Sequence, residues 1–525
     1  MTTSYNALLL ADIAGFALVI AMFLASRVAF REKLYFQDHN SDSLFHRTVL
    51  KLIDKKGFFK TQKDLFFYPI LFHGLYHKVY KAVGWRALAY QALLMDLLIS
   101  IIFLVFIIQV TTLEPDWKLA ALLACFVLNP GLTIQKSGPR IFSFNERTFA
   151  EVVYACFLLF IVLATAEQQA VFLVLAWLSA VVLICSSKFG RQAVLLCPLL
   201  AGLLDQNSMF VLVPLAAFAG ALCLFPLVVH RQFVAQYRHL KWYWYHLDKL
   251  WAGKRNSWQA FEAQKGWNKG RLKHYLFQRN ALSAGALQNF VPLAAVFGSF
   301  FVEVSAEIAA IRSFYLAAVI VWVITSFRPF VIIGEAERYL NYHCILGYVV
   351  VGALLSRADG ALLAIALIGC AAWFAVQLVK ATRAELRRVD KFSRSSEDSG
   401  KSAAFGFLEK QDPGTTLTIG EKGLAEQLAY RTSALPWFSS PEATSRCKAW
   451  PDLFLEYPHP KPCVIECLKT RYFLVNETVL QDKYEGLRSK LLADYVPVFT
   501  CKSHTVYRLR QDGGEDTGEV STERG

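Results

Sequence analysis

Apolar residues gather in long blocks along this chain, and polar segments separate the blocks. The blocks occupy residues 7–29, 87–110, 118–134, 149–166, 169–187, 192–204, 209–229, 282–302, 313–333, 340–356 and 360–379. A helix needs about 20 apolar residues to cross a bilayer core. The blocks lack the alternation of apolar and polar positions that a membrane-spanning β-barrel requires. The pattern therefore predicts a polytopic α-helical membrane protein with about 11 transmembrane helices, counted as one for each block.

The composition agrees with this fold class. Hydrophobic residues make up 55% of the 525 residues, and the formal net charge is +14. In a membrane protein a basic surface is expected to meet lipid phosphates, so we expect membrane lipids and no nucleic acid as partners. The block at 7–29 has no basic segment before it and no small-residue cleavage site after it, so we expect a retained span and not a signal peptide.

The polar segments define the expected domains. Residues 1–380 would form the transmembrane domain, with long loops at 30–86 and 230–281, and a charged, Ser-rich linker would cover 381–412. Residues 413–510 predict a small α/β domain, and the apolar-poor tail 511–525 predicts disorder. The expected strands, rich in β-branched and aromatic residues, are "TTLTIG" (415–420), "CVIECL" (463–468), "RYFLVN" (471–476), "PVFTC" (497–501) and "TVYRL" (505–509).

The number of spans predicts that the loops with chemically interesting residues lie on the same side of the membrane. With a cytoplasmic N-terminus and eleven spans, both long loops and the C-terminal domain lie outside. The inner loops would then carry little more than Lys118, Arg312 and Arg357, whereas the positive-inside rule favours the reverse orientation. We expect the orientation in which the long loops lie outside, because an external site for an anionic lipid headgroup would require cations in those loops.

The segment "QDHNSDSLFH" (37–46) follows the first apolar block and contains Asp38 and Asp42. The two carboxylates are either the solvated end of an interfacial helix or a carboxylate placed for chemistry. Taken alone, the residues favour the solvated helix end. The order of the elements that follow favours chemistry: Phe45-His46, an amphipathic run to Ile53, Gly57-Phe58, and "YPILFH" from Tyr68 to His73.

This order resembles the first external loop of the type C glycosyltransferase superfamily, whose members use polyprenyl-phosphate-linked sugars. Asp42 to His46 resembles an element with an acidic residue followed by an aromatic-His pair, and Tyr68 to His73 resembles a "YPP-L-H" segment. The departures are the second carboxylate at Asp38, Ser43 where some members have an acid, and a single proline at 69–70. Looser similarities occur at "KSGPRIFSFNERTFAEVVY" (136–154), "SSKFGRQAVLL" (186–196), "RPFVIIGEAERYLNY" (328–342) and in the tail.

The resemblance implies an integral membrane enzyme that moves a sugar from a polyprenyl-phosphate donor to an acceptor hydroxyl at the external face. The acceptor would be a glycan, a lipid or a protein, and the location the plasma or inner membrane. Asp42 is the expected base, with Asp38 in reserve, because a positioned carboxylate can take the hydroxyl proton. The residues expected to bind the donor phosphate are Arg140, Arg147, Lys188, Arg191 and Arg338, and those expected to bind substrate are His46, His73, Glu146, Glu335 and Glu337.

Other interpretations stay open for several of these features. For each cation the alternative is a residue that extends to the membrane surface, and for each glutamate an ordinary surface ion pair. The aromatic and basic stretch in 230–281 is expected to lie in the headgroup layer. Cys447, Cys463, Cys467 and Cys501 lie near His459, but they form no CxxC pair, which disfavours a zinc site.

Two functions of another class also fit the sequence: a transporter or flippase of lipid-linked sugars, and a non-catalytic subunit of a cell-envelope polysaccharide assembly. Transporters usually contain inverted repeats and charges within their spans. Here Asp96 lies within the block at 87–110, and no paired repeat is evident. The cofactor is unknown; a reaction without metal is the favoured interpretation, and a divalent metal is the alternative.

Overall fold

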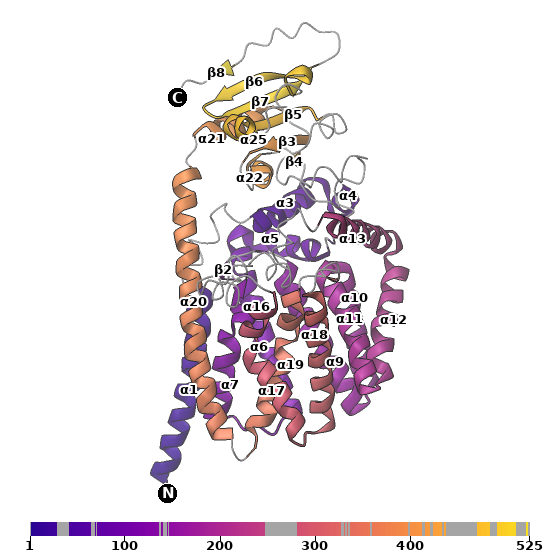
Figure 1. Cartoon of the computed structure of the whole chain (residues 1–525), viewed down its shortest axis with the longest axis vertical. Coiled ribbons are helices and arrows are strands. Elements are labelled where there is room, and N and C mark those ends of the chain that lie inside the picture. The colour runs from indigo at the N-terminus through magenta and orange to yellow at the C-terminus, as the bar shows by residue number, and fades with distance from the viewer. Residues whose placement is uncertain are drawn as a thin grey trace, which may run out of the picture. The chain divides into compact units, whose positions relative to one another are not determined.

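The structure of the chain is a computed structural model, shown in Figure 1. It describes residues 2–28, 41–64, 71–135, 146–246, 281–326, 336–357, 360–396, 399–411, 415–420, 424–432, 470–483 and 491–510, together with 69, 138–139, 144, 330, 333, 435–436 and 521–522. The chain divides into two compact units, which are described one at a time. Unit 1 comprises Met1–Tyr35, Val79–Arg231 and Leu247–Leu386, and unit 2 comprises Phe36–Lys78, Gln232–His246 and Arg387–Gly525.

Unit 1 is a bundle of helices, and each predicted apolar block coincides wholly or partly with a helix. The helices are α1 (Thr2–Val28), α6 (Gln91–Val110), α7 (Trp117–Leu128), α8 (Pro130–Thr133), α9 (Glu146–Glu167), α10 (Ala170–Ser186), α11 (Lys188–Asp205), α12 (Ser208–Leu224), α16 (Ala281–Gln288), α17 (Phe290–Gly298), η4 (Ser299–Phe301), α18 (Ala306–Thr325) and α19 (Ala336–Leu355). A short hairpin, β1 (Ile134–Gln135) and β2 (Gly138–Pro139), follows α8. Three helices extend from one unit into the other: α5 (Leu71–Ala89), α13 (Pro226–His246) and α20 (Gly360–Ser396).

Among the described residues, four helices are long and apolar enough to cross a membrane: α6, α9, α18 and the Gly360–Arg387 part of α20. Helix α12 and the start of α13 add a fifth if this pair, bent by 113°, is one span. Three further apolar helices are shorter: α7, α10 and the stretch Phe290–Phe301. The chain is therefore a multi-pass membrane protein, and the count of about 11 spans stays a prediction.

The block at 282–302 was expected to form one helix, but it is broken between α16 and α17 at Asn289. Pro292 has no N–H to donate to the carbonyl of Gln288, and its ring crowds that carbonyl. The buried Asn289 side chain also donates to the Gly285 carbonyl and to Asn341 Oδ1, at 3.1 and 3.2 Å. Proline and asparagine together end the first helix and restart the second.

Helix α19 lies at the centre of unit 1 and packs against α6, α7, α9, α17 and α18. Its Gly347 lies directly against the side chains of Pro292 and Tyr315, where a Cβ atom would have no room. The Tyr348 ring on the same helix meets the rings of Phe126 and Phe103, which stack on each other at 4.2 Å. Close packing without a side chain at Gly347 therefore fixes α19 in the bundle.

Unit 2 contains a six-stranded mixed sheet of order β4-β3-β5-β7-β6-β8. Strands β3 (Thr415–Ile419), β5 (Tyr472–Asn476), β6 (Tyr495–Cys501) and β7 (His504–Leu509) lie where four of the five strands were predicted. The fifth, at 463–468, lies outside the described residues. The short strands are β4 (Leu435–Pro436) and β8 (Ser521–Thr522). Because Ser521 and Thr522 pair in parallel with β6, the predicted disorder is wrong at these two positions.

Alternate residues of β5 enter two separate apolar cores, as the two-residue period of a strand requires. Leu474 packs with Phe405 and Leu408 of α21 (Ser399–Lys410) and with residues of α22 (Leu424–Arg431). Phe473 and Val475 instead pack with a group that includes Leu480 of α25 (Glu477–Lys483). The segment predicted as a linker thus differs from the expectation: α20 continues to Ser396, and α21 belongs to the core of the sheet.

The first polar loop contributes α3 (Ser41–Lys56), α4 (Phe58–Asp64) and the start of α5 to unit 2, and α3 packs against α22. Gly57 connects α3 to α4 with a φ of 82°, a left-handed conformation that glycine adopts without strain. The Phe58 ring lies on Gly74 of α5, where a Cβ would be 2.6 Å from the ring. The predicted Gly57-Phe58 pair therefore packs against the start of the next helix.

Candidate functional site

The predicted site residues fall into both units. Asp42, His46 and His73 lie in unit 2, and Glu146, Arg147, Lys188, Arg191, Glu337 and Arg338 lie in unit 1. Asp38, Arg140 and Glu335 lie outside the described residues. The two groups are therefore described separately.

Two histidines from the first loop contact each other in unit 2. His46 Nδ1 of α3 lies 2.9 Å from His73 Nε2 of α5, and the rings stack with centroids 5.1 Å apart. Both side chains are buried, with 4% and 0% of their surface exposed. The Phe72 and His73 rings meet edge to face, with their centroids 5.1 Å apart. In this contact one ring nitrogen donates its N–H and the other accepts, and the tautomers of the two imidazoles decide which is the donor.

The helix that carries His46 also carries Asp42, one turn earlier. Helix α3 begins at Ser41, so Asp42 lies in its first turn. About two turns beyond His46 on the same helix, Asp54 Oδ1 lies 3.3 Å from His77 Nε2 of α5. The His46–His73 and Asp54–His77 contacts both join α3 to α5, and together they hold the predicted motif in a fixed geometry.

In unit 1 the first turns of α9, α11 and α19 converge. The Phe189 ring of α11 contacts the rings of Tyr339 and Tyr342 of α19, at centroid distances of 5.1 and 5.3 Å. A Cβ on Gly190 would lie 3.5 Å from the Ala150 Cβ of α9. A helix N-terminus exposes N–H groups and carries a partial positive charge, so three of them together favour an anion.

Several cations occupy these first turns: Arg147 of α9, Lys188 of α11 and Arg338 of α19, which are partly exposed and are called here the cationic cluster. The Arg338 guanidinium lies 5.1 Å from the centre of the Phe189 ring, which ties the first turn of α19 to that of α11. Cation–π contact orients a guanidinium without using its N–H donors. The cluster therefore combines side-chain charge with helix N-termini at the ends of apolar helices.

Arg191 differs from the other predicted cations. It is 1% exposed, and its Nε donates to the Ile184 carbonyl in the last turn of α10 at 2.9 Å. A cation is stabilised at a helix C-terminus, where carbonyl groups lack partners within the helix. Arg191 thus joins α10 to α11 and helps to fix the first turn of α11, which carries Lys188 of the cationic cluster.

The carboxylates predicted to bind substrate lie on two of the same helices. Glu146 is the first residue of α9 and is buried, and Glu337 is in the first turn of α19 and partly exposed. Glu151, which the sequence analysis did not single out, is buried one turn after Glu146. Carboxylates beside several cations can hold the cations in place or accept hydrogen bonds from sugar hydroxyls.

A further buried contact, which the sequence motifs did not indicate, joins α9 to α19. His343 Nδ1 lies 2.8 Å from the Tyr339 carbonyl, and its Nε2 lies 2.7 Å from the Tyr154 hydroxyl of α9. Because a carbonyl can only accept, Nδ1 carries the proton and Nε2 accepts from Tyr154. Polar residues within apolar blocks were the available signal, and here they bind α9 to α19.

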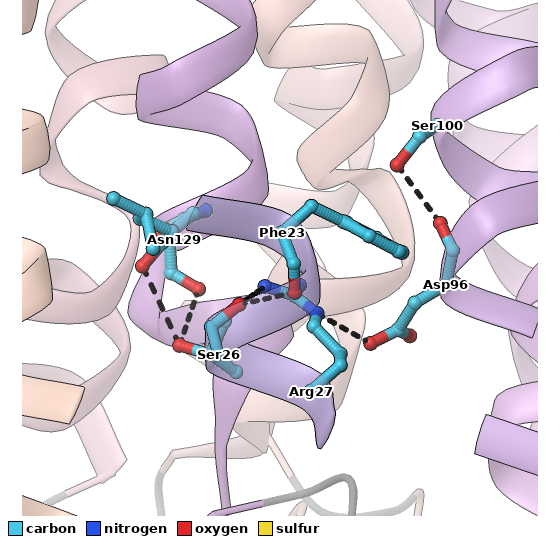
Figure 2. A network of polar contacts seen from close by, with 8 residues as sticks. Phe23, Ser26, Arg27, Asp96, Ser100 and Asn129 are labelled. Atoms are coloured by element: carbon cyan, nitrogen blue, oxygen red, sulfur yellow. Dashed lines mark hydrogen bonds and ion pairs between the residues drawn. The ribbon is translucent and has the colours of Figure 1, made fainter. Parts of the chain in front are cut away.

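A buried ion pair joins α1 to α6, as Figure 2 shows. Arg27 Nε lies 3.1 Å from Asp96 Oδ2, with 2% and 5% of the side chains exposed. Arg27 Nη1 also donates to the Ser26 hydroxyl at 2.7 Å, and its guanidinium lies 4.9 Å from the Phe23 ring centre. Asp96, noted in the sequence as a charge within an apolar block, is therefore paired.

No group of three or more histidine, cysteine, aspartate or glutamate side chains that could hold a metal ion occurs within the described part of the chain. Of the four tail cysteines only Cys501 is described, and it is a buried thiol in the sheet core. Cys447, Cys463 and Cys467, the other cysteines of the disfavoured zinc site, lie outside the described residues.

Comparison with known proteins gives one kind of similarity. No family model matches the chain, and no curated protein sequence matches it significantly. Two crystal structures of ArnT from Cupriavidus metallidurans, one bound to undecaprenyl phosphate and one in the apo state, each align with 94% of this chain and 97% of theirs. The TM-score is 0.49 and the identity 11% in both.

Proposed function

We propose that the chain is a membrane glycosyltransferase, which moves a sugar from a polyprenyl-phosphate donor to an acceptor hydroxyl at the external face of the membrane. The observation that carries the proposal is the cationic cluster at the converging first turns of α9, α11 and α19. A phosphate attached to an apolar chain needs both a cationic site and an adjacent apolar region. Arg147, Lys188 and Arg338 at the ends of apolar helices meet both needs.

The chemistry asks for electrostatic stabilisation at one position and a base at another. When the sugar is transferred, the bond between its anomeric carbon and the phosphate oxygen breaks, and the lipid phosphate leaves with the electron pair. Fixed cations and helix N-termini stabilise this developing charge. The acceptor hydroxyl loses its proton to a carboxylate. Asp42 in the first turn of α3 is the proposed base, and Asp38 is the reserve.

Donor binding tests the proposal without knowledge of the sugar. The full chain in lipid nanodiscs is titrated with undecaprenyl phosphate, and binding is measured for wild type, Lys188→Gln and Arg338→Gln. Loss of one charged hydrogen bond should weaken binding about tenfold or more in each variant. Glutamine keeps most of the side-chain length, so the loss reports on charge and not on packing.

Lys118→Gln is the matched control. Gln91, at the start of α6, donates to Thr148 in the first turn of α9. Lys118 lies at the start of α7, which follows the other end of α6, so the length of α6 separates Lys118 from the first turn of α9. Its substitution should leave binding unchanged. Equal binding by wild type, Lys188→Gln and Arg338→Gln would refute the role of the cationic cluster.

The transporter interpretation gains one specific observation, the break between α16 and α17 at the buried Asn289. Transporters place substrate sites at discontinuous helices. A reconstituted flippase would move a fluorescent polyprenyl-phosphate sugar across vesicles without an acceptor, whereas the proposed transferase would not. Movement without an acceptor, lost in Asn289→Ala, would favour the transporter.

A further inference from the structure

An apolar groove lies between α1, α7 and α20 in unit 1. Its volume is about 630 Å³, and Val19 of α1, Ala121 of α7 and Ala375 of α20 are among its lining residues. Helices α1 and α20 lie side by side in Figure 1, and α1 packs directly against α7. The volume falls within the usual range of about 300–1,000 Å³ for sites that bind small molecules.

Helix α20 covers this groove from the periphery of unit 1. Only 28% of its apolar window is buried, against 67% for α9. The lining residues of α1 run from Gly15 to Ser26. At 1.5 Å per residue this stretch is about 16 Å long, close to one leaflet of a hydrocarbon core of about 30 Å. The groove therefore has the length of a lipid chain in one leaflet.

One end of the groove is polar and cationic. Ser26, Thr382 and Arg383 line that end, and Trp117 of α7 lines the other. Arg383 belongs to a basic band of α20, which contains Lys380, Arg387 and Arg388 but only one carboxylate, the buried Glu385. Because the apolar part of α20 ends at this band, the cations lie at the depth of lipid headgroups.

We propose that this groove binds an anionic phospholipid, with one acyl chain along α1, α7 and α20 and the phosphate at Arg383. The apolar wall fits the chain, and the basic band complements the negative headgroup. The lipid fills the space between the peripheral α20 and the α1–α7 pair. The site is separate from the cationic cluster of α9, α11 and α19 and does not depend on glycosyl transfer.

The test is native mass spectrometry of the full chain with phosphatidylglycerol or phosphatidylcholine that carry the same acyl chains. Wild type should retain one phosphatidylglycerol in preference to phosphatidylcholine. Ala375→Trp fills the groove and should abolish retention of both lipids. Val376→Trp is the matched control, because the neighbouring Val376 is 49% exposed and does not line the groove. Ala372→Phe supplies a second blocking variant, should Ala375→Trp fail to fold.

Charge is tested separately from shape. Arg383→Gln should lower phosphatidylglycerol binding about fivefold, the loss expected for one cation at a lipid surface, and leave phosphatidylcholine binding unchanged. Arg357→Gln, which removes a cation just before the opposite end of α20, should change neither.

Three results would overturn the proposal. The first is equal retention of lipid by Ala375→Trp, Ala372→Phe and Val376→Trp. The second is displacement of phosphatidylglycerol by undecaprenyl phosphate, with loss of undecaprenyl phosphate binding in Ala375→Trp, which would assign the groove to the donor chain. The third is a dimer of the wild type that Ala375→Trp dissociates, which would make the groove an interface between two copies.

Discussion

The buried pair of Arg27 and Asp96 allows a sharp test of the energetics in unit 1. In Asp96→Asn the Arg27 guanidinium keeps the Ser26 hydroxyl and the Phe23 ring but loses its carboxylate partner. Removing one partner of a buried ion pair usually costs about 3–5 kcal/mol, because the other charge stays buried without compensation. Since two contacts remain, we expect a loss near the lower end, about 3 kcal/mol.

The assay is equilibrium unfolding of the purified chain in mixed detergent micelles, followed by circular dichroism. Asp116→Asn is the matched control, because Asp116 is a half-buried N-cap of α7 and asparagine caps a helix about as well. The control should change the free energy of unfolding by less than about 0.5 kcal/mol.

A double variant separates the charge from the contact. Arg27→Met with Asp96→Leu removes both charges and should be about as stable as wild type, because apolar residues of similar volume often replace a buried ion pair without loss. The reasoning would be refuted by a loss below about 1 kcal/mol in Asp96→Asn. A double variant as unstable as Asp96→Asn would equally contradict it, since the cost would then be packing and not charge.

Three further predictions concern the candidate site and its support. Asp42→Asn should lower turnover by about 10²–10⁴-fold while lipid-phosphate binding survives, and Asp38→Asn should be mild; the reverse ranking in a transfer assay would make Asp38 the base. Gly347→Val should destabilise the bundle by about 1–3 kcal/mol or more, measured by the same unfolding assay, because the new side chain meets Pro292 and Tyr315. His46→Phe should cost about 1–3 kcal/mol, since the buried partner imidazole loses this hydrogen bond; an unchanged unfolding midpoint would mean that the bond contributes nothing.

The sequence located helices well because each apolar block is a direct physical requirement of the bilayer. It failed at 282–302, where hydrophobicity concealed Asn289 and Pro292, although both residues are known to interrupt helices. Strand positions in unit 2 were also predictable from β-branched residues. Their order in the sheet was not, because β3 pairs with β5 across a long intervening segment that no local pattern records.

The candidate site shows the same division between local and distant information. Gly57 is a local feature, and the structure places it between α3 and α4 with a left-handed φ. The His46–His73 hydrogen bond joins residues 27 positions apart, and it depends on how α3 meets α5. Arg191 was grouped with the other cations because its segment, 186–196, resembles one in the superfamily and arginine suits phosphate binding. Its burial and its hydrogen bond to the Ile184 carbonyl show that Arg191 differs from the partly exposed cations of the cluster, and the sequence records neither feature.

If the proposed function holds, binding and turnover should depend on different units of the chain. The cationic cluster belongs to unit 1 and is proposed to act on the lipid phosphate, whereas the base proposed to act on the acceptor belongs to unit 2. If a cation binds the phosphate equally in the ground and transition states, its removal weakens donor affinity and leaves turnover unchanged. If the cation binds the leaving anion more tightly than the bound donor, its removal also lowers turnover. Lys188→Gln should therefore raise KM for the donor and can lower kcat, but Asp42→Asn should lower kcat alone. A rise in donor KM in Asp42→Asn equal to that in Lys188→Gln would contradict this separation, because it would place both residues on the donor.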